Sequence, residues 1–468
     1  MRMDEVNMQI EIDNLPTHVA QVGRRLNVLA PDDLAATFLE GSYLAEVAIK
    51  TIALVLLAGV RDSIPDHAYR ISHGLVRADG LGNWEQAIRQ LTSQPLAGFL
   101  PPDFQSILAW AVKKRTKPED AWFQEAKIAT EKVLHELGAE TSENPRGATV
   151  KELITSLVQV RNKTKAHGAV GADFFSSANA DYITAVRALV ENCPAFRWQW
   201  MHFLIRDNGS ICGVLLRGND PRNMPSADLA NFTPSLPGVY FVPERPTQAA
   251  HLPRLVSCCE FLRTTRECTM FLLPNGDYKD NGEAEFIDYA TGKTSMVDVG
   301  SFLSPPVQLP PSETEGSATF DIRSNAFENL PSLPAGYIER RQLQSELEKR
   351  LLDKNHPILT LHGMGGVGKT SLALFAAHKL AASQTPHFEY IAWFSARDVD
   401  LRPAGPSSVR PSVVNLAAVS KAFGSLFGVE PSLESFAEVL ESAEPHSNKG
   451  ILFIFDNQYP FHFLPLPV

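Results

Sequence analysis

A glycine-rich segment of eight residues constrains the fold of this 468-residue chain more than any other feature. Residues 363–370 read GMGGVGKT and match the full pattern G-x4-G-K-[ST]. The apolar run ILTL at residues 358–361 precedes the segment, and the helix-forming residues SLALFAA at 371–377 follow it. A strand, a glycine loop and a helix in this order predict a phosphate-binding loop in an α/β domain with a parallel sheet.

Each residue type in this loop has a chemical reason to be there. Glycines let backbone N–H groups point at phosphate oxygens, and the N-terminus of the following helix adds its positive end. We expect Lys369 to reach the β phosphate of ADP, or the β and γ phosphates of ATP, and the Thr370 hydroxyl to bind Mg²⁺. The alternative is a glycine-rich turn with a surface lysine. The predicted nucleotide-binding residues of the loop are Gly363, Gly365, Gly366, Val367, Gly368, Lys369, Thr370 and Ser371.

A second apolar strand supplies a candidate for the other protein ligand of Mg²⁺. Residues 450–455 read GILFIF and are followed by Asp456, where a carboxylate would complete the metal site. The alternative is a buried strand with an aspartate in the following turn. Asn457 comes next, so no catalytic base is evident beside the metal ligand. Residues 389–394 (EYIAWF) are expected to form a further parallel strand.

Taken together, GMGGVGKTSLA, a strand ending in WFSARD and an apolar strand ending in DN resemble the NB-ARC/STAND group of signalling NTPases. In that group an element like V-G-R-E before the loop packs near the adenine. Tyr337, Ile338 and Arg340 occupy its places here, with Glu339 instead of the usual glycine. The SARD stretch and the proline-rich loop after it resemble bacterial members. The resemblance covers roughly residues 330–457 and implies a switch set by ATP or ADP.

The residues after Asp456 depart from this family. Relatives continue with a sensor strand carrying an arginine, a helical lid and a winged helix. Here the last nine residues contain three prolines, which excludes a helix and disfavours a central strand. We therefore expect a domain truncated by a frameshift or a shortened gene, with poor ATP hydrolysis and weakened nucleotide binding. A non-functional fragment is one alternative.

The first 205 residues have the apolar spacing of helices, and one of these helices carries an arginine on its apolar face. Between residues 149 and 166, Leu153, Ile154, Leu157 and Val158 fall on one stripe, and Arg161 lies on the same stripe. An arginine at such a position must be paired or must face a cleft. The first hypothesis pairs it with Glu46 or Glu40.

The second hypothesis concerns Arg161, Asn162 and His167, which form R-N-x4-H. This pattern resembles the R-x(4–6)-H motif of HEPN domains, helical bundles that include RNA-cleaving toxins. The resemblance implies that the histidine acts as acid and base, that the arginine contacts phosphate, and that a dimer builds the site. A HEPN-like ribonuclease regulated by the NTPase part is therefore an alternative function, although we expect no ribonuclease activity. RNA stays open as a partner only through this module.

Residues 206–300 change to short alternating runs, which predict a small β module. PNGD at residues 274–277 predicts a hairpin turn between two of its strands. Cys258 and Cys259 are adjacent, Cys268 follows nine residues later, and His251 stands alone, so the spacing favours buried thiols over a zinc site.

The sequence therefore predicts a multidomain α and α/β protein in four parts. These are a helical, HEPN-like module at 1–205, the β module at 206–300, a Pro/Ser-rich linker at 301–335 and a partial NB-ARC domain at 336–468.

The composition of the chain limits the kinds of partner and the cellular compartment that we expect for it. With 43 basic and 53 acidic residues the net charge is −10, which gives no general attraction to nucleic acid or to an anionic membrane. The apolar run at 44–60 contains Glu46 and Lys50, leaving ten uninterrupted residues where a spanning helix needs about 20. The five cysteines fit a reducing compartment. We expect a cytoplasmic, nucleotide-binding regulator that contacts protein partners through its helical module.

Overall fold

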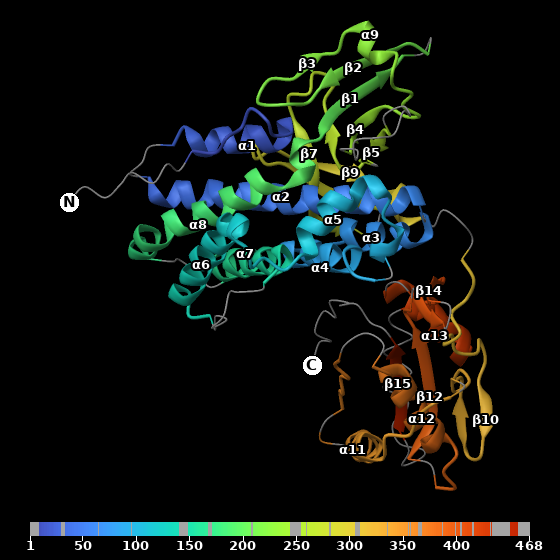
Figure 1. The fold of residues 1–468 in the computed structure, drawn as a ribbon. Coiled ribbons are helices and arrows are strands. Elements are labelled where there is room, and N and C mark those ends of the chain that lie inside the picture. Colours follow the sequence, from blue (N-terminus) through green and yellow to red (C-terminus); the bar gives the residue numbers. More distant parts are fainter. Residues whose placement is uncertain are drawn as a thin grey trace. The chain divides into compact units, whose positions relative to one another are not determined.

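The computed structural model describes the chain except for residues 1–8, 30–32, 64, 95, 140–147, 167–170, 207–208, 244–253, 259, 280–281, 305–308, 335, 354, 356, 364–366, 386, 398, 403–404, 414–415, 431, 433–449 and 457–468. The chain forms two compact units, residues 1–306 (unit 1) and residues 307–468 (unit 2) (Figure 1). Each is described by itself.

The helices of unit 1 surround one long central helix, α2 (Leu34–Ser63). Within α2, the stretch Leu34–Arg61 is long and apolar enough to cross a membrane, but 94% of its most apolar window is buried inside the unit. An all-round apolar helix of this kind forms the centre of a core. The other helices are α1 (Thr17–Asn27), α3 (Pro65–Val76), α4 (Leu81–Leu91), α5 (Gln105–Val112), α6 (Ala121–Glu136), α7 (Val150–Ala166) and α8 (Ala172–Asn192), with 3-10 turns η1 (Leu96–Phe99), η2 (Pro102–Phe104), η3 (Pro118–Asp120) and η4 (Pro194–Arg197).

Two antiparallel sheets complete unit 1. The first has the order β3-β2-β1-β4-β5 and the second has the order β6-β7-β8-β9. The strands are β1 (Gln199–Ile205), β2 (Ile211–Leu215), β3 (Arg222–Asn223), β4 (Gly238–Val242), β5 (Val256–Ser257), β6 (Arg263–Thr264), β7 (Phe271–Lys279), β8 (Glu283–Asp288) and β9 (Thr294–Asp298), and two short helices are α9 (Ser226–Leu229) and α10 (Gly300–Leu303).

The boundary expected at residue 205 does not separate two compact units. Side chains from the helices and from both sheets form one continuous core, in which Trp84 packs against Phe261 and Phe104 against Phe241. The sequence pattern changes from helical to β at this point, but a change of pattern does not require a separate core.

The prediction of a hairpin turn at residues 274–277 is wrong. Strand β7 continues through PNGD, and its pairing with β8 shifts register at Pro274, Gly276 and Lys279. Gly276 has φ +98° and Asp277 has φ +46°, so the local turn chemistry produces a bulge inside the strand. A Cβ on Gly276 would lie 3.2 Å from the Ala78 carbonyl oxygen, which explains why glycine is needed at this close approach.

Unit 2 is built on a four-stranded sheet with the order β10-β11-β12-β15. Strand β12 (Phe388–Ser395) pairs in parallel with β11 (Ala326–Glu328) on one side and with β15 (Gly450–Asp456) on the other. Buried side chains of α12 pack against one side of this sheet and those of α13 against the other. The remaining elements are β10 (Asp321–Arg323), α11 (Arg341–Leu351), α12 (Lys369–Ala381), the hairpin β13 (Val399–Arg402) and β14 (Gly405–Ser408), and α13 (Leu416–Phe427).

Two expectations for unit 2 need correction. Residues 358–361 form no strand, and Ile358 is 85% exposed, because the four-stranded sheet of the described residues includes no strand that pairs with this run. Much of the segment 301–335 is not a spacer, because β10 and β11 belong to the sheet. Asn329 also ties the segment to β12, since its side chain accepts from Trp393 N at 2.6 Å and donates to Trp393 O at 3.1 Å.

Candidate functional site

The glycine loop meets the start of α12 in a conformation that requires glycine. Gly368 caps α12 with φ +87°, and Gly363 has φ +156°, both in the region that side-chain-bearing residues avoid. Lys369 and Thr370 are the first residues of α12, so they lie where backbone N–H groups lack helical partners and favour an anion. Gly365 and Gly366 lie outside the described residues, Val367 is 42% exposed, and Ser371 makes no side-chain hydrogen bond that the structure describes.

The structure brings the two predicted metal ligands together, although they come from elements far apart in the sequence. The Thr370 hydroxyl donates to Asp456 Oδ1 at 2.7 Å. Thr370 lies in the first turn of α12 and Asp456 ends β15, so the contact joins the start of this helix to the C-terminal edge of the parallel strands. Lys369 Nζ donates to the Gly363 carbonyl at 2.8 Å, which folds the lysine back over its own loop.

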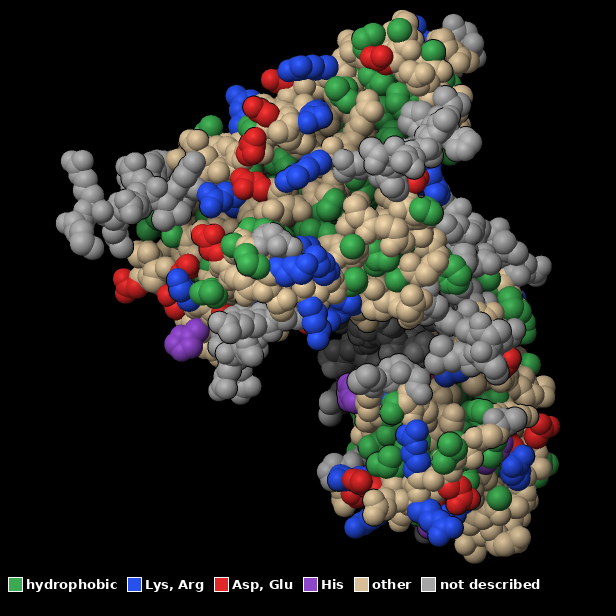
Figure 2. Space-filling view, in the orientation of Figure 1, with side chains coloured by type: hydrophobic (Ala, Val, Ile, Leu, Met, Phe, Trp, Pro, Cys, Tyr) green, Lys and Arg blue, Asp and Glu red, His purple; other side chains and the backbone are tan. Residues whose placement is uncertain are grey.

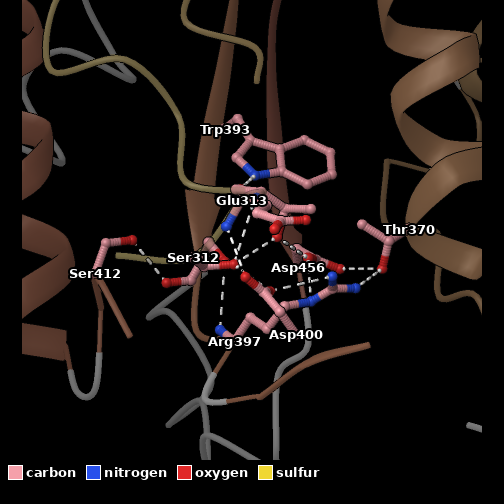
Figure 3. A network of polar contacts seen from close by, with 10 residues as sticks. Ser312, Glu313, Thr370, Trp393, Arg397, Asp400, Ser412 and Asp456 are labelled. Carbon is pink, nitrogen blue, oxygen red and sulfur yellow. Dashed lines mark hydrogen bonds and ion pairs between the residues drawn. The ribbon is translucent and has the colours of Figure 1, made fainter. Parts of the chain in front are cut away.

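Arg397, for which the sequence predicted no role, lies between these ligands (Figure 3). Its Nη2 donates to Thr370 Oγ1 at 2.8 Å, and its Nε lies 3.4 Å from Asp456 Oδ2. Its Nη1 lies 3.7 Å from Asp400 Oδ1. Because Arg397 lies just after the end of β12 at Ser395, the edge where β12 and β15 end supplies both the carboxylate and the guanidinium. The only signal for it in the sequence was its place in the WFSARD stretch.

The residues just after the unit boundary also reach this site, which the linker prediction missed. Asp400, 2% exposed, accepts from Ser312 Oγ and from the Glu313 backbone N–H, each at 2.7 Å. Thr314 Oγ1 donates to Asp456 Oδ2 at 3.3 Å. The indole N–H of Trp393 donates to the Thr314 carbonyl at 2.9 Å and fixes the segment from the β12 side.

Of the three residues expected near the adenine, two lie beside the loop helix. The Tyr337 ring stacks on Phe375 of α12 with centroids 5.2 Å apart, and its hydroxyl accepts from Gln344 at 2.8 Å. The Arg340 guanidinium lies 3.5 Å from where a Cβ on Gly368 would stand. Ile338 is 79% exposed.

The donor set fits a hard divalent cation with a nucleotide phosphate. Mg²⁺ prefers carboxylate and hydroxyl oxygens, which Asp456 and Thr370 present within hydrogen-bond distance of each other. The left-handed Gly368 leads the chain into α12, and the positive end of the dipole of this helix favours a phosphate there. The same oxygens are bonded to Arg397, so a cation and this guanidinium compete for them.

The second candidate site, in unit 1, is not brought together by the described residues. Arg161 Nε donates to Glu46 Oε1 at 2.6 Å, which confirms the hypothesis of a pair with Glu46. Glu40 pairs with Arg25 instead. Asn162 is exposed, and His167 lies outside the described residues.

The Arg161–Glu46 pair belongs to a larger buried network that spans α2, α7 and the second sheet. The Tyr289 hydroxyl donates to Glu46 Oε2 at 2.8 Å, and Lys50 Nζ donates to the same hydroxyl at 2.7 Å. Burial, followed by the negative charge of Glu46, raises the pKa of Tyr289 well above its usual value. Tyr289 therefore stays protonated and serves as a fixed donor.

The cysteines show no metal chemistry in the part of the chain that the structure describes, where no cluster of three or more His, Cys, Asp or Glu side chains could hold a metal ion. Cys258 and Cys268 are buried, and burial raises the pKa of Cys258 to about 12 and that of Cys268 to about 11. Cys268 Sγ lies 3.2 Å from His202 Nδ1. Cys259 and His251 lie outside the described residues.

The site has the features of a P-loop nucleotide-binding domain, namely the glycine loop, the start of a helix, the lysine and the Thr370–Asp456 contact. Residues 340–399 match the NB-ARC domain family, and this match supports an NB-ARC/STAND type of P-loop NTPase in this part of the chain. The match includes the loop, α12, β12 and Arg397 but ends before Asp456. No curated protein and no solved structure matches the chain.

Proposed function

We propose that unit 2 is an ADP- or ATP-binding switch of a STAND-type signalling regulator, with Mg²⁺ held by Thr370 and Asp456. The observation that carries this is the contact between those two side chains beside a loop in which the described glycines, Gly363 and Gly368, both have positive φ angles. Bound nucleotide would place its phosphates at the start of α12, where Lys369 exchanges the Gly363 carbonyl for phosphate oxygens. Mg²⁺ would neutralise phosphate charge there.

We expect binding rather than fast hydrolysis to be the relevant event. Asn457 follows Asp456 where a second acid could activate water, so the chain offers no catalytic base at that position. The resemblance to bacterial members of the group then favours a slow switch whose nucleotide state is communicated to other parts of the chain.

The test compares two lysines of the same helix. In calorimetry with Mg·ADP and Mg·ATP, Lys369→Ala should lower the affinity at least about 100-fold, because it removes the cation that binds phosphate. Lys379→Ala is the matched control, since Lys379 also lies on α12 but pairs with Glu348 at the surface. Equal affinities of wild type and Lys369→Ala would refute the assignment.

For unit 1 we propose a structural role for Arg161 and a role in protein contacts for the module, not RNA cleavage. Arg161 is committed to a buried carboxylate. On the face shown in Figure 2, described Lys and Arg side chains occur together with Asp and Glu side chains over both units. Such a mixed surface gives little general attraction for a polyanion. RNA cleavage by the wild type that is lost in Arg161→Ala would contradict this proposal.

A further inference from the structure

We propose that Arg397 is a nucleotide-sensing residue, which ties the P-loop to residues 312–314 and is displaced when Mg·nucleotide binds. This inference rests on the proposed function of unit 2 as a nucleotide switch. It assigns to that switch the segment through which its state is transmitted.

Competition for two side chains is the first step. Thr370 Oγ1 accepts from Arg397 at 2.8 Å and donates to Asp456 at 2.7 Å, so its hydrogen-bonding capacity is largely used within the protein. Mg²⁺ requires oxygen lone pairs at short range and in near-octahedral geometry. A guanidinium held against the same hydroxyl and carboxylate would stand at contact distance from a divalent cation, and like charges at that distance repel. Loading of the site therefore moves Arg397 away from Thr370 and Asp456.

Transmission through Asp400 is the second step. Arg397 also faces Asp400 at 3.7 Å, and Asp400 in turn accepts from Ser312 Oγ and the Glu313 N–H. Asp456 holds the same segment through Thr314 Oγ1, on the oxygen that faces Arg397. Asp400 and Asp456, which both face Arg397, thus bind the three consecutive residues 312–314. When Arg397 moves away and Asp456 binds a cation instead, the hydrogen bonds to residues 312–314 weaken together.

The contacts that remain decide how far the segment moves. Trp393 still donates to the Thr314 carbonyl, and the Arg410 N–H still donates to the Pro310 carbonyl at 2.8 Å. Residues 312–314 are therefore loosened on loading rather than detached. Along the chain they lie a few residues after the boundary between the units at residue 306, on the segment that leads to unit 1.

Amide hydrogen exchange of the full chain, with and without Mg·ADP, tests the link between Arg397 and residues 312–314, which we call the tie. The reporter is a single group, the Glu313 N–H. In the wild type, Mg·ADP should accelerate exchange at Glu313 by about tenfold, because its acceptor is released. In Arg397→Gln, exchange should be fast without nucleotide and should not rise further. The same variant should bind Mg·ADP about tenfold more tightly, because no guanidinium has to be displaced. Arg323→Gln, which removes an arginine paired with Glu328 in the same unit, should behave as the wild type.

Asp400→Asn is the second variant, because it keeps the shape of a buried side chain while weakening its hold on Arg397 and Ser312. It should also show fast exchange at Glu313 without nucleotide, and a thermal unfolding transition near that of the wild type would show that it folds. Wild-type binding of Mg·ADP without a change at Glu313, weaker binding by Arg397→Gln, or an altered response in Arg323→Gln would each overturn the tie while leaving the nucleotide site intact. Absence of Mg·ADP binding by the wild type would overturn the proposed function and the tie together.

Discussion

Arg161 in unit 1 and Arg397 in unit 2 are both paired with a carboxylate that lies far away in the sequence, and their burial is almost the same. The side chains of Arg161 and Glu46 are 20% and 3% exposed, and those of Arg397 and Asp456 are 21% and 7% exposed. Burial therefore does not distinguish a structural ion pair from one at a ligand site.

The neighbours of each carboxylate do distinguish them. Glu46 is surrounded by groups that cannot leave without unpacking the core, namely Arg161, the Tyr289 hydroxyl and, through it, Lys50. Asp456 is bonded to Thr370, which lies in the first turn of a helix that follows a left-handed glycine, where an anion and its cation are favoured. We infer that the first network stabilises the fold and that the second exchanges partners.

The largest effect on stability is expected from the substitution Glu46→Gln, which tests whether the first network stabilises the fold. The substitution keeps the shape of the side chain but leaves Arg161 and Lys50 without their buried anion, so the free energy of unfolding should fall by about 3–5 kcal/mol. Nucleotide affinity should not change. Urea unfolding followed by tryptophan fluorescence measures this mainly in unit 1, because five of the six tryptophans lie there.

Glu260→Gln is the control for that measurement. Glu260 pairs with Arg263 at 3.2 Å on the surface of the same unit, where an ion pair contributes no more than about 1 kcal/mol. A loss in Glu46→Gln no larger than in this control would show that the network does not stabilise unit 1.

Sequence reasoning found the parts of the site that are encoded locally. The glycine loop, Lys369 and Thr370 lie within one motif, and Asp456 ends an apolar run whose pattern marks a buried strand. The Arg161–Glu46 pair was also within reach, because a cation on an apolar helical stripe requires an anion. In each case a short segment carries its own physical reason.

What sequence reasoning missed depends on pairing between distant segments. Residues 358–361 have a strand-like pattern, but a strand forms only where a neighbouring strand accepts its hydrogen bonds. Residues 309–315 have the composition of a linker, yet Ser312 and Thr314 are buried against carboxylates 88 and 142 residues away. Neither composition nor periodicity contains that information, so Arg397 and Asp400 also had no visible role.

A smaller effect concerns protons in the core of unit 1. Burial lowers the pKa of His18 to about 3, against an ordinary value of 6.5, while its Nε2 bonds to Thr51 Oγ1 at 3.0 Å. The unfolded chain takes up a proton below pH 6.5 and the folded chain does not, so stability falls as the pH drops from 6.5 towards 3. The loss should approach 1.4 kcal/mol per pH unit, or about 2 kcal/mol between pH 6.5 and 5.

Urea unfolding at pH 7.5, 6 and 5 in wild type and in His18→Gln isolates this contribution. Glutamine can still bond to Thr51 but does not titrate in this range, so the stability of the variant should depend less steeply on pH. His73, whose pKa burial lowers to about 4, is present in both proteins and cancels in the difference. Parallel pH profiles of the two proteins would contradict the assignment to His18.

The last comparison deletes one hydroxyl in each network, and the smallest effect is expected in unit 2. Tyr289→Phe removes a donor from the enclosed carboxylate Glu46 and a partner from Lys50, so unfolding free energy should fall by about 2 kcal/mol. Thr314→Val removes a longer bond to Asp456 and the 3.0 Å contact with Ser312 Oγ. Because Asp456 keeps its contacts to Thr370 and Arg397, the loss should be about 1 kcal/mol. Thr385→Val, at an exposed position of unit 2, is the control.

The order of the two losses in stability matters more than their values. An enclosed carboxylate cannot replace a lost donor with water, whereas a carboxylate beside the phosphate-binding loop can. Equal losses in Tyr289→Phe and Thr314→Val would mean that Asp456 is as enclosed as Glu46, and the distinction between a structural network and an exchanging one would not hold.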